Sequence, residues 1–340
     1  MLKKAMHWES TEEKEDKKVR CLLCAHNCVI APGKCGICGV RENRDGELYS
    51  LIYGLASSVG VDPIEKKPLF HFHPGSRVLS FGTAGCNFRC PHCQNWEISQ
   101  CGPEELRLQE IMPAEAVEMA KRHRCEGMAW TYNEPAIWHE YALDSMKLAK
   151  EAGLYTVYVT NGYINEKPLR EIAPYLDAAN VDVKGFSDEF YKEIAGARLM
   201  PVLKTCKLMK ELNIHLEVTY LVIPTKNDSA DEMRRFCEWV ANELGTEVPV
   251  HFSAFHPDYK LASLPITPSG KLKEAHEIGR AAGLKYLYLG NAALRGFGDT
   301  VCPKCGNTLI ERSGFSVRVL GGIKNGRCLA CNRRIPVIGV

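Results

Sequence analysis

The sequence predicts an α/β protein built around a full or partial (β/α) barrel. Between about residues 77 and 292, short apolar runs alternate with amphipathic stretches. Alternation of this kind indicates a parallel sheet made of βα units. Polar, cysteine or glycine residues follow almost every apolar run. Chemistry gathered at the carboxyl ends of many strands favours a barrel over a doubly wound sheet, which concentrates it at one switch point.

The apolar runs are short enough to be buried strands, and they cover residues 77–83, 128–131, 155–160, 180–183, 216–223, 250–255 and 286–289. Helices are predicted between them, near residues 114–124, 135–152, 166–175, 187–195, 200–212, 229–244 and 268–282. In the stretch 135–152, Pro135 opens the helix, Ala142 and Met146 share one face, and Gly153 ends it.

The composition is ordinary for a globular chain, with 45% hydrophobic and 25% charged residues among 340. A formal net charge of +2 creates no long-range field, so charge does not indicate nucleic acid or an anionic membrane as a partner. No apolar run approaches the roughly 20 residues that span a bilayer, and the first residues do not resemble a signal peptide. We therefore expect a cytoplasmic protein without nucleic-acid or membrane partners.

Sixteen cysteines are unusual for such a chain. In a reducing compartment they indicate metal or cluster ligands rather than disulfides. Most form three local groups; the isolated ones, to which no role is given, are Cys101, Cys125, Cys206 and Cys237. These groups divide the chain into a charged leader (1–20), a cysteine-rich segment with a linker (21–76), the barrel core (77–297) and a small C-terminal domain (298–340).

The central group is Cys86, Cys90 and Cys93, which lie on a loop after the first predicted strand with the spacing Cys-x3-Cys-x2-Cys. An iron–sulfur cube takes four cysteine ligands, so three would leave one iron open to a substrate or cofactor. The alternative is a tetrahedral zinc knuckle, with His92 or Cys101 as its fourth ligand. The preceding strand and the glycines of the loop favour the cluster.

This cysteine spacing resembles the signature of the radical S-adenosylmethionine (SAM) superfamily. Within it, the chain resembles the glycyl-radical activating group, which includes pyruvate formate-lyase activase, and more closely the AmmeMemoRadiSam branch. The supporting phrases are Lys-Lys-Pro-Leu-Phe-His-Phe (66–72), Cys-Gln-Asn-Trp-Glu-Ile-Ser (93–99), Trp-Thr-Tyr-Asn-Glu-Pro (130–135) and Asp-Val-Lys-Gly (182–185). The resemblance runs from about residue 21 to the C-terminus. It implies a radical SAM barrel with a [4Fe–4S] cluster on the three cysteines and SAM on the open iron.

The resemblance also implies a SAM-binding role for residues that follow the predicted strands. Glu134 stands where relatives bind the methionyl amino group with a Gly-Gly-Glu motif, and Tyr132 and Asn133 replace the glycines. Lys184, in the phrase that begins at Asp182, matches the residue that meets the methionyl carboxylate. Ammonium and carboxylate groups form strong charge-assisted hydrogen bonds with each other. We therefore expect Asn133, Glu134, Asp182 and Lys184 to contribute to SAM binding.

Two further residues gain a role by resemblance, and two depart from the family pattern. Asn161 matches a motif near the nucleoside, and His256 matches a histidine close to the cleaved SAM in activases. Val159 replaces an Asp that helps activases bind a monovalent cation, which argues against such a cation here. His92 replaces the aromatic ring that usually precedes the last cysteine, and this alters the adenine contacts.

The flanking cysteine groups predict further metal sites. Two Cys-x2-Cys pairs near the C-terminus are typical of a zinc ribbon, with rubredoxin-type iron as the alternative; they are Cys302, Cys305, Cys328 and Cys331. A domain of about 40 residues has little core, so we expect metal to fold it. In the N-terminal group the resemblance implies Cys21, Cys24, Cys28 and Cys38 as ligands and Cys35 as a spare. Zinc and an auxiliary iron–sulfur cluster both remain open there.

By resemblance, the chain is an enzyme that cleaves SAM reductively to methionine and a 5′-deoxyadenosyl radical, which abstracts hydrogen from an unidentified substrate. A low-potential donor of the ferredoxin or flavodoxin type supplies the electron, and no acid–base dyad is required. Metal modules at both ends would crowd a large partner, so a small metabolite, shared with a Memo-like or AMMECR-like protein, is preferred over a glycine of a glycyl-radical enzyme. The rival class is a non-enzymatic zinc-binding scaffold, and near-neutral charge argues against its nucleic-acid form.

Overall fold

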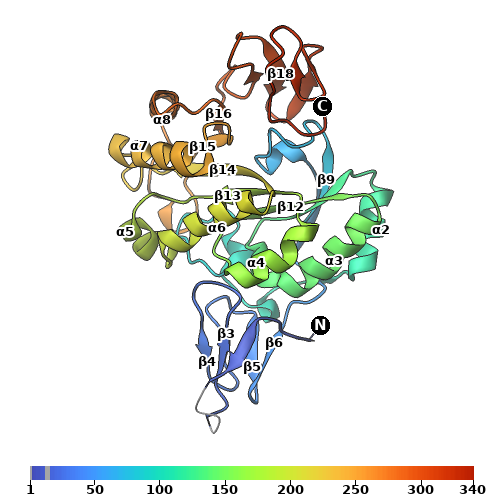
Figure 1. Cartoon of the computed structure of the whole chain (residues 1–340). Helices are drawn as coiled ribbons and strands as arrows, with labels where there is room; N and C mark the ends of the chain where they lie inside the picture. The colour runs from blue at the N-terminus through green and yellow to red at the C-terminus, as the bar shows by residue number, and fades with distance from the viewer. Residues whose placement is uncertain (1, 12–15) are drawn as a thin grey trace.

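The computed structural model describes residues 2–11 and 16–340, which form three parts (Figure 1). A central sheet with its helices lies between a small N-terminal β unit, drawn in blue, and a C-terminal β unit, drawn in red. The two small units lie at opposite ends of this view, and each carries one of the flanking cysteine groups. Within the part of the chain that the structure describes, no helix is long and apolar enough to cross a bilayer.

The central sheet has eight strands in the order β16-β15-β14-β13-β12-β11-β9-β8. From β9 to β16 every pairing is parallel, and spatial order follows chain order. The strands are largely buried, as expected for a parallel sheet. Their bounds are β8 (Ser58–Pro63), β9 (Arg77–Gly82), β11 (Gly127–Trp130), β12 (Tyr155–Thr160), β13 (Ala178–Asp182), β14 (His215–Val222), β15 (Val250–Ala254) and β16 (Leu287–Gly290). The predicted α/β fold is confirmed.

Helices follow the parallel strands and pack against the sheet (Figure 1). They are α1 (Trp96–Ser99), α2 (Pro113–Arg122), α3 (His139–Glu151), α4 (Glu166–Ile172), α5 (Asp188–Phe190), α6 (Leu199–Glu211), α7 (Ala230–Trp239) and α8 (Ser269–Ala281). In α3 the buried residues Ala142, Met146 and Ala149 recur at the spacing of one helix face. Pro135 opens a 3-10 turn that leads into α3, and Gly153 takes a left-handed φ of +74° just after it. The helix predicted at 135–152 is therefore present.

The barrel is partial. Among the described residues, β8 and β16 form the two edges of the sheet and are not hydrogen-bonded to each other. β8 pairs antiparallel with β9, so that Val61 lies opposite Leu79. This strand was not predicted, because its half-buried sequence Ser-Val-Gly-Val-Asp-Pro has only a weak apolar pattern.

Residues 64–76 plug the amino end of the barrel. Leu69 and Phe72 share a buried cluster with Val78, Ala129 and Val157 near the starts of three strands. The phrase 66–72, which carries part of the family resemblance, therefore lies at the amino ends of the strands. The central cysteines lie at the carboxyl ends.

A buried glutamate holds residues 64–76 in place through hydrogen bonds. Glu217 of β14 accepts hydrogen bonds from the backbone N–H groups of Phe70 (3.0 Å) and His71 (2.7 Å). The imidazoles of His215 and His251 lie 3.1 and 2.6 Å from its carboxylate oxygens. Four groups from three segments thus converge on one side chain that is fully buried.

The C-terminal unit covers the plug. It contains β17 (Thr300–Val301), β18 (Thr308–Ser313), β19 (Ser316–Val319), β20 (Ile323–Lys324) and β21 (Arg327–Cys328). The His71 ring lies 2.6 Å from the Tyr288 hydroxyl, and Phe72 forms a β-bridge with Ile338. Tyr286 and Tyr288 share a core with residues of the C-terminal unit, which are Cys302, Leu309, Ile310, Ile323, Cys328, Ile335 and Val337. This unit is therefore packed onto the amino edge of the sheet.

The N-terminal unit consists of two three-stranded sheets. Their strands are β1 (Lys3–Lys4), β6 (Glu47–Ser50) and β5 (Arg41–Arg44), and β2 (Trp8–Ser10), β3 (Val19–Cys21) and β4 (Val29–Ile30). The described part of the charged leader is thus paired within this unit, whereas residues 1 and 12–15 of the leader lie outside the described residues. A further pair joins β7 (Leu55–Ala56) to β10 (Gln109–Glu110). The boundaries at residues 20, 76 and 297 stay predictions.

Candidate functional site

The cysteine loop begins where β9 ends, at the carboxyl edge of the sheet. Its thiols, called the loop thiols, belong to Cys86 and Cys90, which are buried, and to Cys93, which is half-buried. Gly85 has φ +82°, and a Cβ there would lie 2.5 Å from the Cys38 carbonyl oxygen. Only glycine meets both demands. The loop therefore has its predicted place after the first parallel strand and lies tightly against the N-terminal unit.

The loop thiols are not grouped as compactly as the ligands of a single zinc ion. Zn–S bonds of tetrahedral sites hold thiolates roughly 3.8 Å from one another. Within the described chain, the loop thiols do not form a group whose ligand atoms all lie within 4.8 Å of one another. Cys101 donates to the Glu97 carbonyl, and His92 is buried with no hydrogen-bond partner among the described residues. At least two of the loop thiols are thus farther apart than zinc ligands, which argues against the zinc knuckle and favours the larger iron–sulfur cube.

Glu134 follows β11 and is buried next to the loop. Its carboxylate accepts hydrogen bonds from the Thr160 hydroxyl and the Asn161 N–H, both at 2.7 Å. Burial raises the pKa of Glu134 to about 7, and these hydrogen bonds only partly oppose the rise. Its neighbours include the Cys86 thiol, whose pKa burial raises well above its usual value, and the Lys184 ammonium. A buried carboxylate in this setting gains from an added ammonium, which offsets the cost of its desolvated charge.

Lys184 lies just beyond the end of β13 and faces the loop. Its Nζ forms an ion pair with Asp182 Oδ2 at 2.6 Å. Burial alone would lower the pKa of Lys184, but Asp182 and the thiols of Cys90 and Cys93 raise it above its usual value. A protonated ammonium is thus held beside the loop thiols, where it can meet an anionic group.

Two asparagine side chains brace the loop. Asn133 accepts a hydrogen bond from the Thr83 N–H at 3.1 Å and donates to the Gly85 carbonyl at 2.7 Å. Asn161 donates to the Asn87 side chain at 2.8 Å. Both residues were predicted to contribute to SAM binding. The structure places both at the site and shows that they position the cysteine loop.

His256 is at the same edge but is more exposed. It follows β15, its side chain is exposed, and its ring lies 3.0 Å from the Asn291 carbonyl. In the same segment, the ring of Tyr259 stacks on that of Trp96, with the two ring centroids 5.0 Å apart. Trp96 lies three residues after the last loop cysteine, so this stacked pair stands beside the mouth of the barrel.

Tyr132 has a structural role that the sequence analysis missed. Its φ of +71° is strained for a bulky residue. The Tyr132 hydroxyl donates to Asp62 at 2.6 Å, and Lys67 Nζ bonds the same carboxylate oxygen at 2.7 Å and lies 4.8 Å from the Tyr132 ring. Burial lowers the pKa of Lys67 to about 8 against the opposing effect of Asp62. The resemblance held a clue to this backbone conformation, because relatives have glycine at the position of Tyr132 and glycine takes a positive φ without strain.

Buried polar contacts that no sequence pattern predicted tie the N-terminal unit to the barrel. Arg41 Nη1 bonds the Glu140 carboxylate at 2.9 Å, and both side chains are almost fully buried. His7 and His139 lie 2.6 and 2.9 Å from the same oxygen of Glu171. These three side chains also bring their ligand atoms within 4.8 Å of one another. Hydrogen bonds account for this group of two histidines and a glutamate, so we interpret it as a contact that attaches the N-terminal unit to the barrel.

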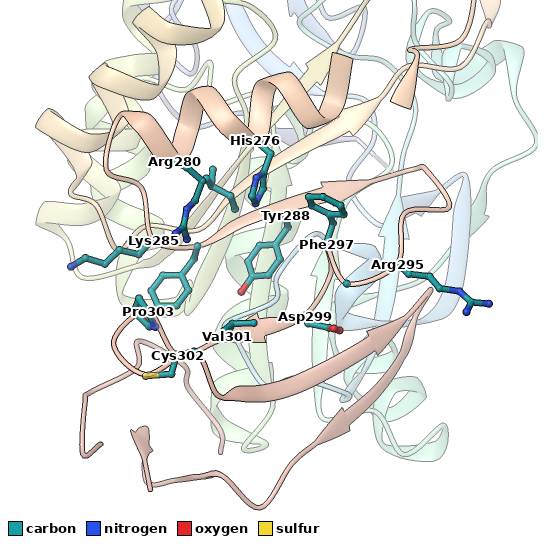
Figure 2. Close-up of a pocket in the computed structure, with 14 residues that line it drawn as sticks. His276, Arg280, Lys285, Tyr288, Arg295, Phe297, Asp299, Val301, Cys302 and Pro303 are labelled. Atoms are coloured by element: carbon teal, nitrogen blue, oxygen red, sulfur yellow. The ribbon is translucent and has the colours of Figure 1, made fainter. Parts of the chain in front are cut away.

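A pocket of about 510 Å³ lies between α8, β16 and the C-terminal unit (Figure 2). Aromatic rings, including Tyr288 and Phe297, and the cations of Arg280 and Arg295 contribute to its lining. Of the predicted site residues it contains Cys302. Because the pocket adjoins the amino end of β16, it lies away from the loop thiols and is not the predicted SAM site.

The C-terminal cysteines form a compact group. Cys302 and Cys331 place their sulfur atoms 3.5 Å apart, and Cys305 and Cys328 place theirs 3.6 Å apart. All four lie within 4.8 Å of one another, close to the edges of a zinc–thiolate tetrahedron. These four cysteines, called the ribbon quartet, fit the predicted zinc-ribbon-like module.

Changing Cys305 and Cys328 together to Ser is expected to remove about one zinc per chain and to lower the unfolding temperature, because the quartet ties together a small unit with little core of its own. Zinc measured by plasma mass spectrometry and a thermal unfolding scan check this. Cys101→Ser, outside the three cysteine groups, is the control and should keep the zinc. Loss of cluster iron instead of zinc would show that the ribbon assignment is wrong.

A family model for the radical SAM superfamily matches residues 81–237, a span that begins in β9 and includes the loop thiols, Glu134 and Lys184. An uncharacterized protein of Methanocaldococcus jannaschii, MJ0808, is 45% identical over 338 residues, which cover 99% of this chain and 100% of that protein. The pyruvate formate-lyase-activating enzyme of Clostridium pasteurianum is 26% identical over 215 residues, covering 59% of this chain and 89% of that enzyme. The structure of Streptococcus suis SuiB bound to the precursor peptide SuiA shares the fold, with a TM-score of 0.50 and 12% identity over 68% of this chain and 51% of that chain.

Membership of this superfamily implies a [4Fe–4S] cluster and SAM. The side chains at the carboxyl edge fit both groups. The loop thiols do not all lie within 4.8 Å of one another, and a buried carboxylate and a protonated lysine lie beside them. The chain therefore belongs to the radical SAM superfamily, as an enzyme of the radical SAM class that resembles the pyruvate formate-lyase-activating enzymes.

Proposed function

We propose that this chain cleaves SAM reductively to methionine and a 5′-deoxyadenosyl radical, which abstracts hydrogen from a substrate. The observation that carries the proposal is the loop of widely spaced thiols beside Glu134 and Lys184. A [4Fe–4S] cluster on Cys86, Cys90 and Cys93, when bound, supplies the electron. The radical SAM activases that the chain resembles generally take this electron from a reductant such as flavodoxin or ferredoxin, and we propose the same class of donor here.

The protein's part is to position SAM and to exclude water. Glu134 would bind the methionyl ammonium and Lys184 the methionyl carboxylate, with Asp182 holding the lysine in place. Asn133 and Asn161 keep the cysteine loop fixed through their hydrogen bonds. A nucleoside contact of Asn161 and a role for His256 rest on the resemblance alone.

The direct test is incubation of the anaerobically reconstituted protein with SAM and dithionite. We expect brown protein and chromatographic detection of 5′-deoxyadenosine and methionine. A colourless protein that binds zinc at all three cysteine groups and leaves SAM intact would support the scaffold class instead.

For the substrate, we propose a small molecule. The N-terminal unit packs against the cysteine loop on one side, where the His26 ring lies 2.8 Å from the Asn87 carbonyl. The stacked pair of Trp96 and Tyr259 stands on the other. The C-terminal unit does not add to this crowding, contrary to the sequence-based expectation, because it packs at the amino edge.

The similarity to an activating enzyme favours a second candidate, a glycine in a partner protein. Electron paramagnetic resonance of the protein with SAM, reductant and candidate partners separates the two. A stable glycyl doublet on a partner chain would establish the activase function. The AmmeMemoRadiSam branch and its Memo-like and AMMECR-like partners stay predictions, which co-purification from cells that express all three proteins would test.

Glu134→Gln and Lys184→Met are each expected to weaken SAM binding by about 1.5–3 kcal/mol, because each removes one partner of a desolvated, charge-assisted hydrogen bond. Calorimetric titration of the reconstituted variants with SAM checks this. Glu211→Gln and Lys210→Met make the same changes at exposed positions of α6 and should keep the affinity of the wild type. Unchanged affinity in the Glu134 and Lys184 variants would reject both assignments.

A further inference from the structure

The N-terminal cysteines gather into a set of four, called the N-terminal quartet. The Cys24 thiol interacts electrostatically with those of Cys21, Cys28 and Cys38. Cys38 in turn interacts with Cys21 and Cys28. The fifth cysteine, Cys35, is exposed and has charged side chains as its electrostatic neighbours, which are Glu42, Glu104 and Arg44. The fold itself therefore selects four ligands from five candidates.

The surroundings of the quartet suit thiolates. The backbone N–H of His26 donates to Cys24, and that of Val40 donates to Cys38, so each sulfur receives a hydrogen bond from the residue two positions later. The buried guanidinium of Arg41 interacts with two of the four thiols. Donors and a cation of this kind stabilise anionic sulfur that is bound to metal.

The spacing of the quartet differs from that of the zinc-type group in the same molecule. The ribbon quartet brings pairs of sulfur atoms to 3.5 and 3.6 Å and holds all four within 4.8 Å. Within the described residues, no three thiols of the N-terminal quartet form such a group, although they interact electrostatically. The loop thiols show the same wide spacing. In every trio of these four thiols, at least one pair of sulfur atoms is therefore more than 4.8 Å apart, a wider spacing than that of the ribbon quartet.

We propose that Cys21, Cys24, Cys28 and Cys38 bind a second [4Fe–4S] cluster. Four cysteine ligands leave no iron open, so this site carries electrons and does not bind SAM. It lies directly against the first site: the Cys38 carbonyl occupies the space beside Gly85, and the Arg89 side chain donates to the Ile37 carbonyl. One electron enters from a low-potential ferredoxin- or flavodoxin-type donor and leaves for the cluster on the loop thiols. The transfer of this electron to the loop-thiol cluster rests on the proposed function, whereas the binding of a cluster by the N-terminal quartet does not.

The decisive protein is the Cys86→Ala/Cys90→Ala/Cys93→Ala variant, which keeps the N-terminal quartet intact. After anaerobic reconstitution it is expected to hold about four iron and four sulfide per chain, against about eight of each in the wild type. It should also give the paramagnetic signal of a reduced cluster. A variant without iron and with a second zinc overturns the proposal, and so does iron without sulfide.

Cys24→Ala/Cys38→Ala, with the loop thiols intact, is expected to lose half of the iron. Cys35→Ala is the matched control and should keep all of it. If the double variant does not fold, the iron count of the loop variant still decides the question. Failure of the wild type to cleave SAM would refute the proposed function and leave that count unaffected, so the two outcomes are separable.

Discussion

Replacing Cys86, Cys90 and Cys93 together with Ala is expected to abolish the production of 5′-deoxyadenosine from SAM. In the proposed function these thiols are the ligands that leave an iron open to SAM, and the N-terminal quartet, with four proposed ligands, has no such position. Cys101 is the nearest other cysteine along the chain, and its thiol donates to the Glu97 carbonyl. We therefore expect complete loss in an anaerobic assay with SAM and dithionite, although iron remains bound elsewhere.

A double variant of cysteines outside the metal groups, Cys101→Ala/Cys125→Ala, is the control for the number of thiols removed. It should form 5′-deoxyadenosine at the rate of the wild type. Production that persists in the triple loop variant would mean that SAM is cleaved elsewhere or by another route.

The core of the fold was predictable because its strands are buried. A parallel strand covered on both faces reads as a continuous apolar run, and the run predicted at 155–160 coincides with β12. The edge strand β8 lacks this signal, because its one buried residue is the polar Asp62 and the others are half-buried. It was therefore missed, together with the plug at 64–76, whose contacts are made with residues far away in the sequence.

The site was predictable where one residue carries one chemical task. The cysteine spacing located the loop, and the family resemblance indicated Glu134 and Lys184, which the structure places beside it. What the sequence did not contain was the pairing between strand ends. The hydrogen bonds from Asn133 to Gly85 and from Asn161 to Asn87 join residues separated by 48 and 74 positions. Their bracing function appears only once the strands lie side by side.

The flanking units show the same limit. The two Cys-x2-Cys pairs predict a compact quartet, because each pair has a recognised spacing for zinc. The N-terminal spacing is compatible with zinc and with a cluster, so the sequence leaves both open, and the cluster proposed above depends on distances between thiols that the fold sets. The buried pair of Arg41 and Glu140 holds that unit in place across 99 positions of sequence.

The largest effect on stability is expected from Glu217→Ala, which should lower the free energy of unfolding by about 3–5 kcal/mol. Burial alone would raise the pKa of Glu217, but hydrogen bonds from His215 and His251 hold it well below its usual range. Truncation leaves these imidazoles and the N–H groups of Phe70 and His71 without their buried acceptor. Urea unfolding followed by circular dichroism checks this, and Glu211→Ala, at an exposed position, should stay within about 0.5 kcal/mol of the wild type.

The same network makes stability depend on pH, and the sign follows from the two pKa shifts. Burial lowers the pKa of His71 to about 3, so the folded chain keeps this ring neutral while the unfolded chain protonates it below 6.5. The contribution of this residue to stability therefore falls as pH decreases from 7.5, by about 1.4 kcal/mol at pH 5.5. The contribution of ionised Glu217 is lost only below about pH 4.5, where the unfolded carboxylate binds a proton. The decrease from His71 at pH 5.5 should thus remain in Glu217→Ala. Glu134, with its pKa raised to about 7, changes stability in the opposite direction over the same range, so the wild type is compared with His71→Phe. Equal pH dependence of these two proteins between pH 7.5 and 5.5 would contradict a neutral, buried His71.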